Sequence, residues 1–152
     1  MSLDADAARL WRTPLFSEVD PAQLKMLAFA ALRIRRRPGE VLVRQAERSN
    51  AAFIIISGVA KYTPEDRPAT YERRLTSGAV IGEYALLIGK PSPITVVAAE
   101  HLLALKISRE LIERFTAEFP EIGERMLGAW RRRMRRTSAQ LHQTHAAISR
   151  YL

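Results

Sequence analysis

Apolar and polar residues alternate in two different ways along this chain. Between residues 21 and 31 apolar side chains recur every three or four positions, directly after an Asp20-Pro21 pair that is typical of a helix start. From Leu32 to Ile107, short apolar runs are separated by turn-forming Gly, Pro and Ser residues. Beyond Ser108 the helical period returns. The pattern predicts a short helix, an all-β block and a helical C-terminal segment.

Six strands are expected in the β block. Each is a run of β-branched or apolar residues that ends at a turn signal such as Pro38-Gly39 or Ser57-Gly58. Because the turns recur at regular, short spacing, the block is expected to form a roll or a barrel. The expected strands are Glu40–Gln45, Phe53–Ser57, Val59–Thr63, Tyr71–Thr76, Pro93–Ala99 and Leu102–Ile107.

The C-terminal segment is expected to contain two helices. Ser108 can cap the first, which should end at Phe119-Pro120. In the second, seam positions recur in steps of three and four residues, as in a coiled coil. A helix of about 30 residues is about 45 Å long and exceeds what a roll of this size covers, so a partner helix is expected. The alternative is that the seam packs on the chain's own β block. The seam consists of Leu127, Trp130, Met134, Thr137, Leu141, Thr144, Ile148 and Tyr151.

Composition narrows the chemistry. The 152 residues include no cysteine, which excludes disulfides, thiolate nucleophiles and zinc sites built on cysteine. The net charge of the chain is +8. The segment from residue 121 onward contains seven Arg and two Glu and therefore contributes +5 of this charge. The arginines between residues 131 and 136 fall off the seam, so they are expected to stay hydrated. Contact with nucleic acid or a membrane through this cluster is the alternative.

Residues 81–97 read IGEYALLIGKPSPITVV and lie between two expected strands. They resemble the phosphate-binding cassette of the cyclic nucleotide-binding domain family: Gly-Glu, apolar or small residues, a short loop, Pro-Arg, two small residues and Thr-Val. Upstream, Pro38-Gly39-Glu40, residues 53–58 and Leu15-Phe16 are similar to other signatures of the family. The resemblance covers about residues 13 to 150.

This resemblance implies a mainly β fold with flanking helices. The expected architecture is a double-stranded β-helix, a jelly-roll-like β-roll, with a short N-terminal helix and a long C-terminal dimerisation helix. It is similar to the sensor domains of the catabolite activator and FNR-like branch, without their helix-turn-helix domain. We expect the β-roll and N-terminal helix in residues 1–118 and the dimerisation helix in residues 119–152.

A ligand site along the cassette is implied as well. A helix that opens at Gly82-Glu83 presents free N–H groups that suit a phosphate, although an acidic residue there is also favoured by the helix dipole alone. The resemblance implies that Glu83 holds the ribose 2′-hydroxyl. It also implies that a Thr-Ser pair on the dimer helix, here Thr137-Ser138, reaches the adenine. The expected ligand-binding residues are Gly82, Glu83, Tyr84, Ala85, Ser92, Pro93, Thr95, Thr137 and Ser138.

Three positions depart from the family pattern. Ser92 replaces the arginine that would pair with the cyclic phosphate, and loss of this charge-assisted contact costs about 2 to 5 kcal/mol if unreplaced. Pro93 removes a backbone N–H that the family usually offers to the phosphate. Lys90 could supply a substitute charge but is expected to be solvated. Ala46 stands where the family commonly has a left-handed glycine, which predicts a different hairpin there.

The expected function is therefore regulatory. We expect a cytoplasmic ligand-sensing module that binds cyclic AMP or cyclic GMP weakly, or binds a different ligand. The alternatives are a ligand-free dimerisation module, or a sensor fragment of a longer transcription regulator or channel. The three histidines have no recognisable catalytic or metal-binding partners, and no apolar run suits a bilayer, so we expect no enzyme, metal site, membrane contact or DNA-binding domain in this chain. A parallel homodimer is expected through Leu127, Trp130, Met134, Thr137, Leu141 and Ile148.

Overall fold

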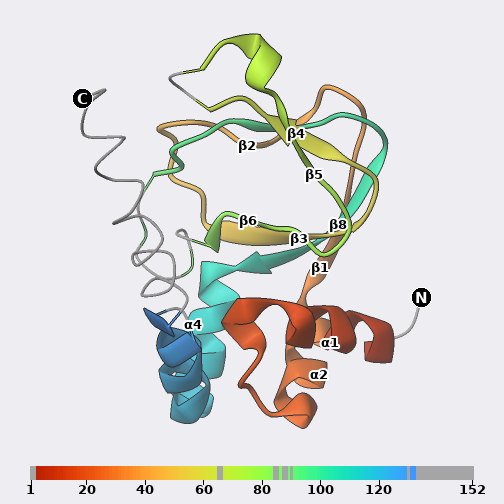
Figure 1. Cartoon of the computed structure of the whole chain (residues 1–152). Coiled ribbons are helices and arrows are strands. Elements are labelled where there is room, and N and C mark those ends of the chain that lie inside the picture. The colour runs from red at the N-terminus through yellow and green to blue at the C-terminus, as the bar shows by residue number, and fades with distance from the viewer. Residues whose placement is uncertain are drawn as a thin grey trace.

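The computed structural model describes residues 3–64, 67–83, 86, 89, 91–129 and 131–132. In these residues a β-roll adjoins a layer of helices, which lies below it in Figure 1. The helices are α1 (Leu3–Arg12), α2 (Pro21–Ala30) and α4 (Arg109–Glu118), with a 3-10 turn at Pro14–Phe16, and residues 120–129 are also helical. No helix in the described ranges combines the length and apolar character needed to cross a bilayer.

Two antiparallel sheets of four strands face each other in the roll (Figure 1). The sheet next to the helices has the order β1 (Leu32–Arg36), β8 (Leu102–Ser108), β3 (Ala51–Ser57) and β6 (Val80–Ile81). The opposite sheet has the order β2 (Val41–Val43), β7 (Val96–Ala98), β4 (Ala60–Tyr62) and β5 (Arg73–Leu75). The predicted mainly β fold with flanking helices is confirmed.

Local capping explains where two helices begin. A carboxylate oxygen of Asp20 accepts a hydrogen bond from the Ala22 N–H at 2.8 Å, and Pro21 occupies the first turn of α2. The Ser108 hydroxyl accepts one from the Leu111 N–H at 3.1 Å and caps α4. Both helix starts agree with the sequence prediction.

The described residues include one α-helix and two strands that the sequence analysis did not name. Helix α1 begins with two acidic residues and ends with two arginines, an arrangement that the helix dipole favours. Strands β1 and β6 were also missed. All six expected strands are present, most of them shorter than expected. The strand expected from Tyr71 begins only at Arg73, because Ala69–Tyr71 forms a 3-10 turn.

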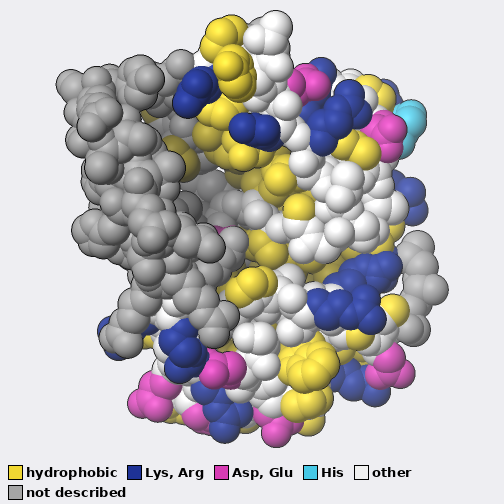
Figure 2. Space-filling model, in the orientation of Figure 1, with side chains coloured by type: hydrophobic (Ala, Val, Ile, Leu, Met, Phe, Trp, Pro, Cys, Tyr) yellow, Lys and Arg dark blue, Asp and Glu magenta, His cyan; other side chains and the backbone are white. Residues whose placement is uncertain are grey.

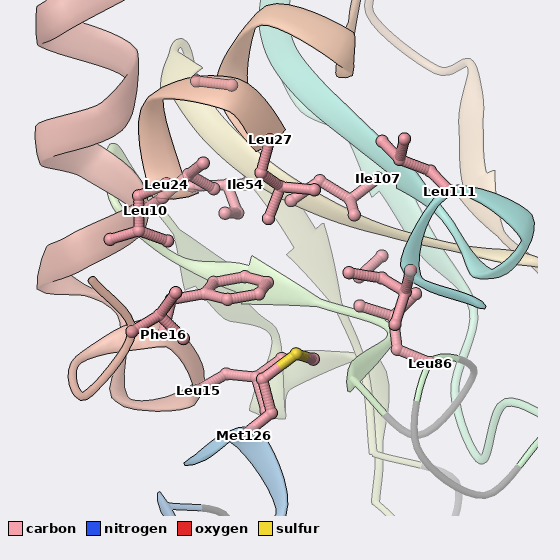
Figure 3. Close-up of a cluster of buried hydrophobic side chains, with 14 of the residues drawn as sticks. Leu10, Leu15, Phe16, Leu24, Leu27, Ile54, Leu86, Ile107, Leu111 and Met126 are labelled. Carbon is pink, nitrogen blue, oxygen red and sulfur yellow. The ribbon is translucent and has the colours of Figure 1, made fainter. Parts of the chain in front are cut away.

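Buried side chains form two clusters, one on each face of the sheet that contains β3 and β8. The helical cluster lies between this sheet and the helices, and Figure 3 shows the Phe16 ring at its centre. The roll cluster lies between the two sheets. Successive residues of β3 alternate between them, since Ala52 and Ile54 join the helical cluster while Phe53 and Ile55 join the roll cluster.

An ion pair attaches α1 to the edge of the roll. The Asp6 carboxylate on α1 is only 5% exposed and accepts a hydrogen bond from the Arg33 guanidinium of β1 at 2.6 Å. A second pair, Lys25 with Asp4 at 2.8 Å, joins α2 to α1 at the surface. Because the first pair is partly buried, removal of one of its partners should cost more free energy of unfolding than removal of a partner of the exposed pair.

The helical segment 120–129 packs on the chain's own core along one face. Ile122, Met126 and Ala129 are buried there, whereas Leu127, a predicted seam residue, is 41% exposed. The side chain of Gln23 on α2 donates to Glu121 Oε1 at 2.7 Å. The backbone N–H of Glu121, and then this amide, lower the pKa of Glu121 below its usual value. The other seam positions, Trp130, Met134, Thr137, Leu141, Thr144, Ile148 and Tyr151, lie outside the described residues.

Candidate ligand-binding site

A cavity of about 190 Å³ lies between the two sheets of the roll. Both sheets and the cassette contribute to its wall, and most of the contributing side chains are apolar. In Figure 2, hydrophobic side chains run down the middle of this face of the molecule, over the roll and the helices. The lining residues are Val43, Ser49, Tyr62, Leu75, Val80, Ile81, Gly82, Glu83, Ser92, Pro93, Ile94 and Val96.

The Gly82-Glu83 end of the cavity depends on a close approach between two chain segments. Gly82 has a φ of +83°, and a Cβ atom there would lie 2.9 Å from the carbonyl oxygen of Ala51 in β3. Any other residue would have to shift one of these segments. This approach brings Glu83, the first helical residue after the strand, to the cavity wall. Tyr84 and Ala85 lie outside the described residues.

Ser92 hydrogen-bonds to its own loop. Its hydroxyl donates to the Ile94 carbonyl at 2.6 Å and accepts from the Ile94 N–H at 3.3 Å, which is a local serine turn. The Ser92 N–H donates to the Glu47 carbonyl at 3.2 Å. Since Pro93 has no N–H, none of the three consecutive backbone positions 92–94 has an N–H that is free for an anion.

The turn at residues 44–47 is tied to the same loop. The Ala46 N–H donates to the Ser92 carbonyl at 2.9 Å, and the Gln45 N–H donates to Thr95 Oγ1 at 2.9 Å. Ala46 has a φ of +64°. The prediction of a different hairpin is therefore wrong, because these hydrogen bonds hold Ala46 in the left-handed conformation at a cost of about 1 kcal/mol.

Two contacts join the cassette to the helical layer. Leu86 is buried in the helical cluster, which also contains Met126 (Figure 3). Gly89 has a φ of +62°, and the Arg109 guanidinium occupies the space that a side chain at position 89 would need. Arg109 is the first residue of α4, where its Nε lies 3.3 Å from a carboxylate oxygen of Glu113. The Arg109 side chain of α4 therefore lies against the cassette at Gly89.

The remaining predicted site residues are not all brought to the cavity. Gly82, Glu83, Ser92 and Pro93 line it, whereas the Thr95 hydroxyl binds the neighbouring turn. Thr137 and Ser138 lie outside the described residues. In the described part of the chain, no three His, Asp or Glu side chains are grouped in a way that could hold a metal ion.

The sequence analysis missed the strand residues of the cavity wall. Tyr62 on β4 lies on the same face as the buried Ala60, and Ala60 pairs with Leu75 of β5. Strand alternation places Tyr62 and Leu75 on the inner face, next to the cavity. The alternation was readable in the sequence, but the pairing of the two strands was not.

Comparison with known proteins identifies the fold family. Residues 33–119 match the family model described as "Cyclic nucleotide-binding domain". The chain belongs to the cyclic nucleotide-binding domain family.

Curated relatives of this cyclic nucleotide-binding domain have different activities. The chain is 30% identical over 99 residues to a cGMP-dependent protein kinase of Toxoplasma gondii. This alignment covers 65% of the chain and 10% of the kinase. The chain is 29% identical over 131 residues to the acetyltransferase Pat of Mycolicibacterium smegmatis, covering 84% of the chain and 38% of that protein. The chain thus spans about a tenth of the kinase and less than half of the acetyltransferase.

Solved structures agree with the fold. A cyclic nucleotide-binding-like protein from Brucella abortus has a TM-score of 0.66 at 29% identity, covering 74% of this chain and 98% of that one. The N-terminal domain of a Streptomyces coelicolor transcriptional regulator has a TM-score of 0.75 at 23% identity, covering 87% and 93%. The Thermus thermophilus catabolite activator protein has a TM-score of 0.70 at 21% identity, covering 88% and 63%. The last two establish the fold alone.

Proposed function

We propose that this chain is a regulatory ligand-sensing domain whose site is the cavity between the two sheets. In this proposal cyclic AMP or cyclic GMP binds weakly, or the site takes a different ligand. The observation that carries the proposal is the contrast between the two ends of the cassette. Gly82 still brings Glu83 to the cavity wall, whereas positions 92–94 have no N–H left for a phosphate.

The family relatives support a cyclic nucleotide as the reference ligand. Their names include a cGMP-dependent protein kinase and a CRP-like cAMP-activated global transcriptional regulator of Mycobacterium tuberculosis. The chain is 25% identical to the latter over 138 residues, covering 87% of the chain and 60% of the regulator. In the present cassette position 92 has no guanidinium to pair with an anion, and the Ser92 hydroxyl already donates to the Ile94 carbonyl. Loss of about 3 kcal/mol from such a contact weakens a dissociation constant by about two orders of magnitude.

Titration calorimetry with cyclic AMP and cyclic GMP tests the proposal. The double change Ser92→Arg with Pro93→Ala supplies a guanidinium and an N–H at position 93, and it also releases the Ile94 N–H from the serine hydroxyl. The double variant should therefore bind cyclic AMP about 100-fold more tightly than the wild type. Each single change should recover less.

Two controls decide the interpretation. Adding Glu83→Ala to the double variant should remove the recovered affinity, because Glu83 is assigned the ribose hydroxyl. Wild-type binding at micromolar concentration or below would contradict the assignment of Ser92 as a disabling change. A double variant that also fails to bind would favour the alternative, a ligand-free dimerisation module.

We also propose a homodimer through the C-terminal helix. The exposure of Leu127 supports it, since its neighbours Ile122 and Met126 already pack on the chain's own core. An apolar seam left in water would be unfavourable. Met134→Glu should therefore yield monomers in sedimentation experiments at tens of micromolar, whereas Arg131→Glu, off the seam, should leave the dimer intact. A monomeric wild type would refute the proposal.

A further inference from the structure

Helix α2 is apolar on the face that it turns away from the core as well as on the face that it buries. Leu24 and Leu27 are buried in the helical cluster, whereas Phe29 is 80% exposed and Met26 is 46% exposed. Only two of the ten residues of α2 are polar. A helix that is apolar all round is normally covered on every side. We infer that the outer face of α2 docks on the same face of a second copy of the chain, apart from the ligand cavity and the C-terminal helix.

Two apolar grooves flank the outer face of α2, and every residue that lines them is among the described residues. One groove, of about 500 Å³, lies between α2, the start of α1 and α4, and Phe29 and Phe115 contribute to its wall. The other, of about 410 Å³, lies between α2 and α1, where Trp11 is 55% exposed. Figure 2 shows hydrophobic side chains gathered over the helical layer, in the lower part of the view. Ala22 lines both grooves, so both open beside this small side chain.

The spacing of residues along α2 fits an antiparallel pairing with a second α2. Phe29 lies seven positions, or about 10 Å, after Ala22 on the same face of the helix. A two-fold axis across the middle of α2 sets each Phe29 ring opposite Ala22 of the second copy, where the two grooves open. The large side chain at one end of the face therefore meets the small side chain at the other end. A symmetric contact between identical surfaces requires this kind of self-complementarity.

The charge of this surface suits a second copy better than a charged partner. The residues that line the two grooves include one ammonium group, Lys25, and one carboxylate, Asp4, which pair at 2.8 Å. The grooves therefore carry no net charge that would attract nucleic acid or an anionic membrane. In the antiparallel pairing Lys25 lies near the two-fold axis, where its apolar stem packs while its ammonium group stays on Asp4.

The exposed area indicates a weak contact. Trp11, Met26 and Phe29 together expose about 350 Å², at about 200 Å² for each complete side chain. A standard interface buries about 800 Å² per partner, so these three side chains supply nearly half of that area. With the groove walls around them, the surface reaches the low end of specific interfaces, where contacts are transient. Combined with a dimer through the C-terminal helix, this second symmetric contact would link dimers into larger assemblies.

Sedimentation equilibrium of the full chain with Met134→Glu tests this contact apart from the C-terminal helix. The dissociation constant of the remaining dimer should be about 0.1–1 mM. Adding Phe29→Glu should weaken this association at least about tenfold, because it places a carboxylate against the apolar grooves of the second copy. The matched control Tyr71→Glu changes an exposed ring between β4 and β5, at the opposite end of the molecule in Figure 1, and should leave the constant unchanged. An unchanged urea midpoint for Phe29→Glu would show that its fold is intact.

Disulfide formation tests the antiparallel geometry, since the chain has no cysteine of its own. At about 0.5 mM, Met26→Cys should form an interchain disulfide at least about tenfold faster than Ala22→Cys under the same oxidation. The two-fold axis passes beside position 26, whereas the two copies of position 22 lie about 10 Å apart along the helices. Equal rates, or a faster reaction of Ala22→Cys, would overturn the inference.

The remaining outcomes separate this contact from the other proposals. A Met134→Glu variant that stays monomeric at about 1 mM refutes the inference and leaves the ligand site untouched. If that variant is still dimeric at tens of micromolar and Phe29→Glu dissociates it, the inference stands and the C-terminal helix is not the dimer contact. If Phe29→Glu leaves that dimer intact, the inference fails. Binding of the monomer to phosphatidylglycerol vesicles that Phe29→Glu abolishes, without self-association, would assign the outer face of α2 to a membrane instead.

Discussion

The helical cluster and the roll cluster share a sheet but are filled differently. The helical cluster is built mainly from large side chains, among them Phe16, Leu24 and Met126. Four of the eleven buried residues of the roll cluster are alanines, Ala51, Ala60, Ala98 and Ala104. The cavity lies on the alanine-rich side. The two faces of the sheet therefore differ in the side-chain volume that fills them.

This contrast assigns different tasks to the two faces. The helical cluster holds α1, α2, α4 and segment 120–129 against the sheet, and it also contains Leu86 of the cassette. The roll cluster contributes to the wall of the cavity between the two sheets. A substitution in the helical cluster should therefore act mainly on stability, and a substitution in the roll cluster mainly on binding.

The largest expected effect comes from a matched pair on β8, where Leu105 faces the helical cluster and Leu102 faces the roll cluster. Leu105→Ala should lower the free energy of unfolding by about 3–5 kcal/mol, and Leu102→Ala by about 2–3 kcal/mol, since a less completely filled cluster loses fewer contacts. Urea unfolding followed by circular dichroism measures both. Equal losses would show that the two clusters are packed equally well.

An intermediate effect is expected at the junction of α1 with the roll. Asp6→Ala should lower the free energy of unfolding by about 2–4 kcal/mol, because it leaves the partly buried Arg33 guanidinium without its carboxylate. Asp4→Ala, which removes the exposed pair with Lys25, should cost less than about 1 kcal/mol. Thermal unfolding distinguishes the two variants. Similar losses would mean that α1 is held by apolar packing alone.

The smallest expected effect is a stabilisation in the turn that borders the cavity. Ala46→Gly should raise the free energy of unfolding by about 0.5–1 kcal/mol, because glycine adopts the observed positive φ without strain. Added freedom of glycine in the unfolded chain offsets part of this gain. Val43→Ala, at the last position of β2 directly before the turn, serves as a destabilising comparison. A destabilised glycine variant would show that Ala46 is not strained.

Local signals predicted helix starts better than they predicted the site. The Asp20 and Ser108 caps were readable because the capping side chain and the backbone N–H that donates to it lie two or three residues apart. The acidic start and basic end of α1 were equally local, but the sequence analysis did not use them. Strand β6 has only two residues and carries no period at all.

At the phosphate end of the candidate site, the sequence could not predict the hydrogen bonds between distant segments. Ser92 and Pro93 were recognised from the motif as departures from the family pattern. The bond from the Ser92 N–H to Glu47 joins positions 45 residues apart, and no local pattern encodes it. For the same reason the sequence suggested a different hairpin at Ala46, where hydrogen bonds from the cassette loop instead impose the left-handed turn.

Strand pairing in the roll has a consequence for the time course of folding. β1 pairs with β8, and β2 pairs with β7, so partners are separated by most of the β block. Closing such long loops is slow, and domains dominated by contacts of this kind fold in about milliseconds to seconds. During synthesis the roll cannot close before residue 108 has left the ribosome. The cavity, which exists only between the closed sheets, therefore forms late, and a newly made chain exposes the apolar inner faces of its strands until then.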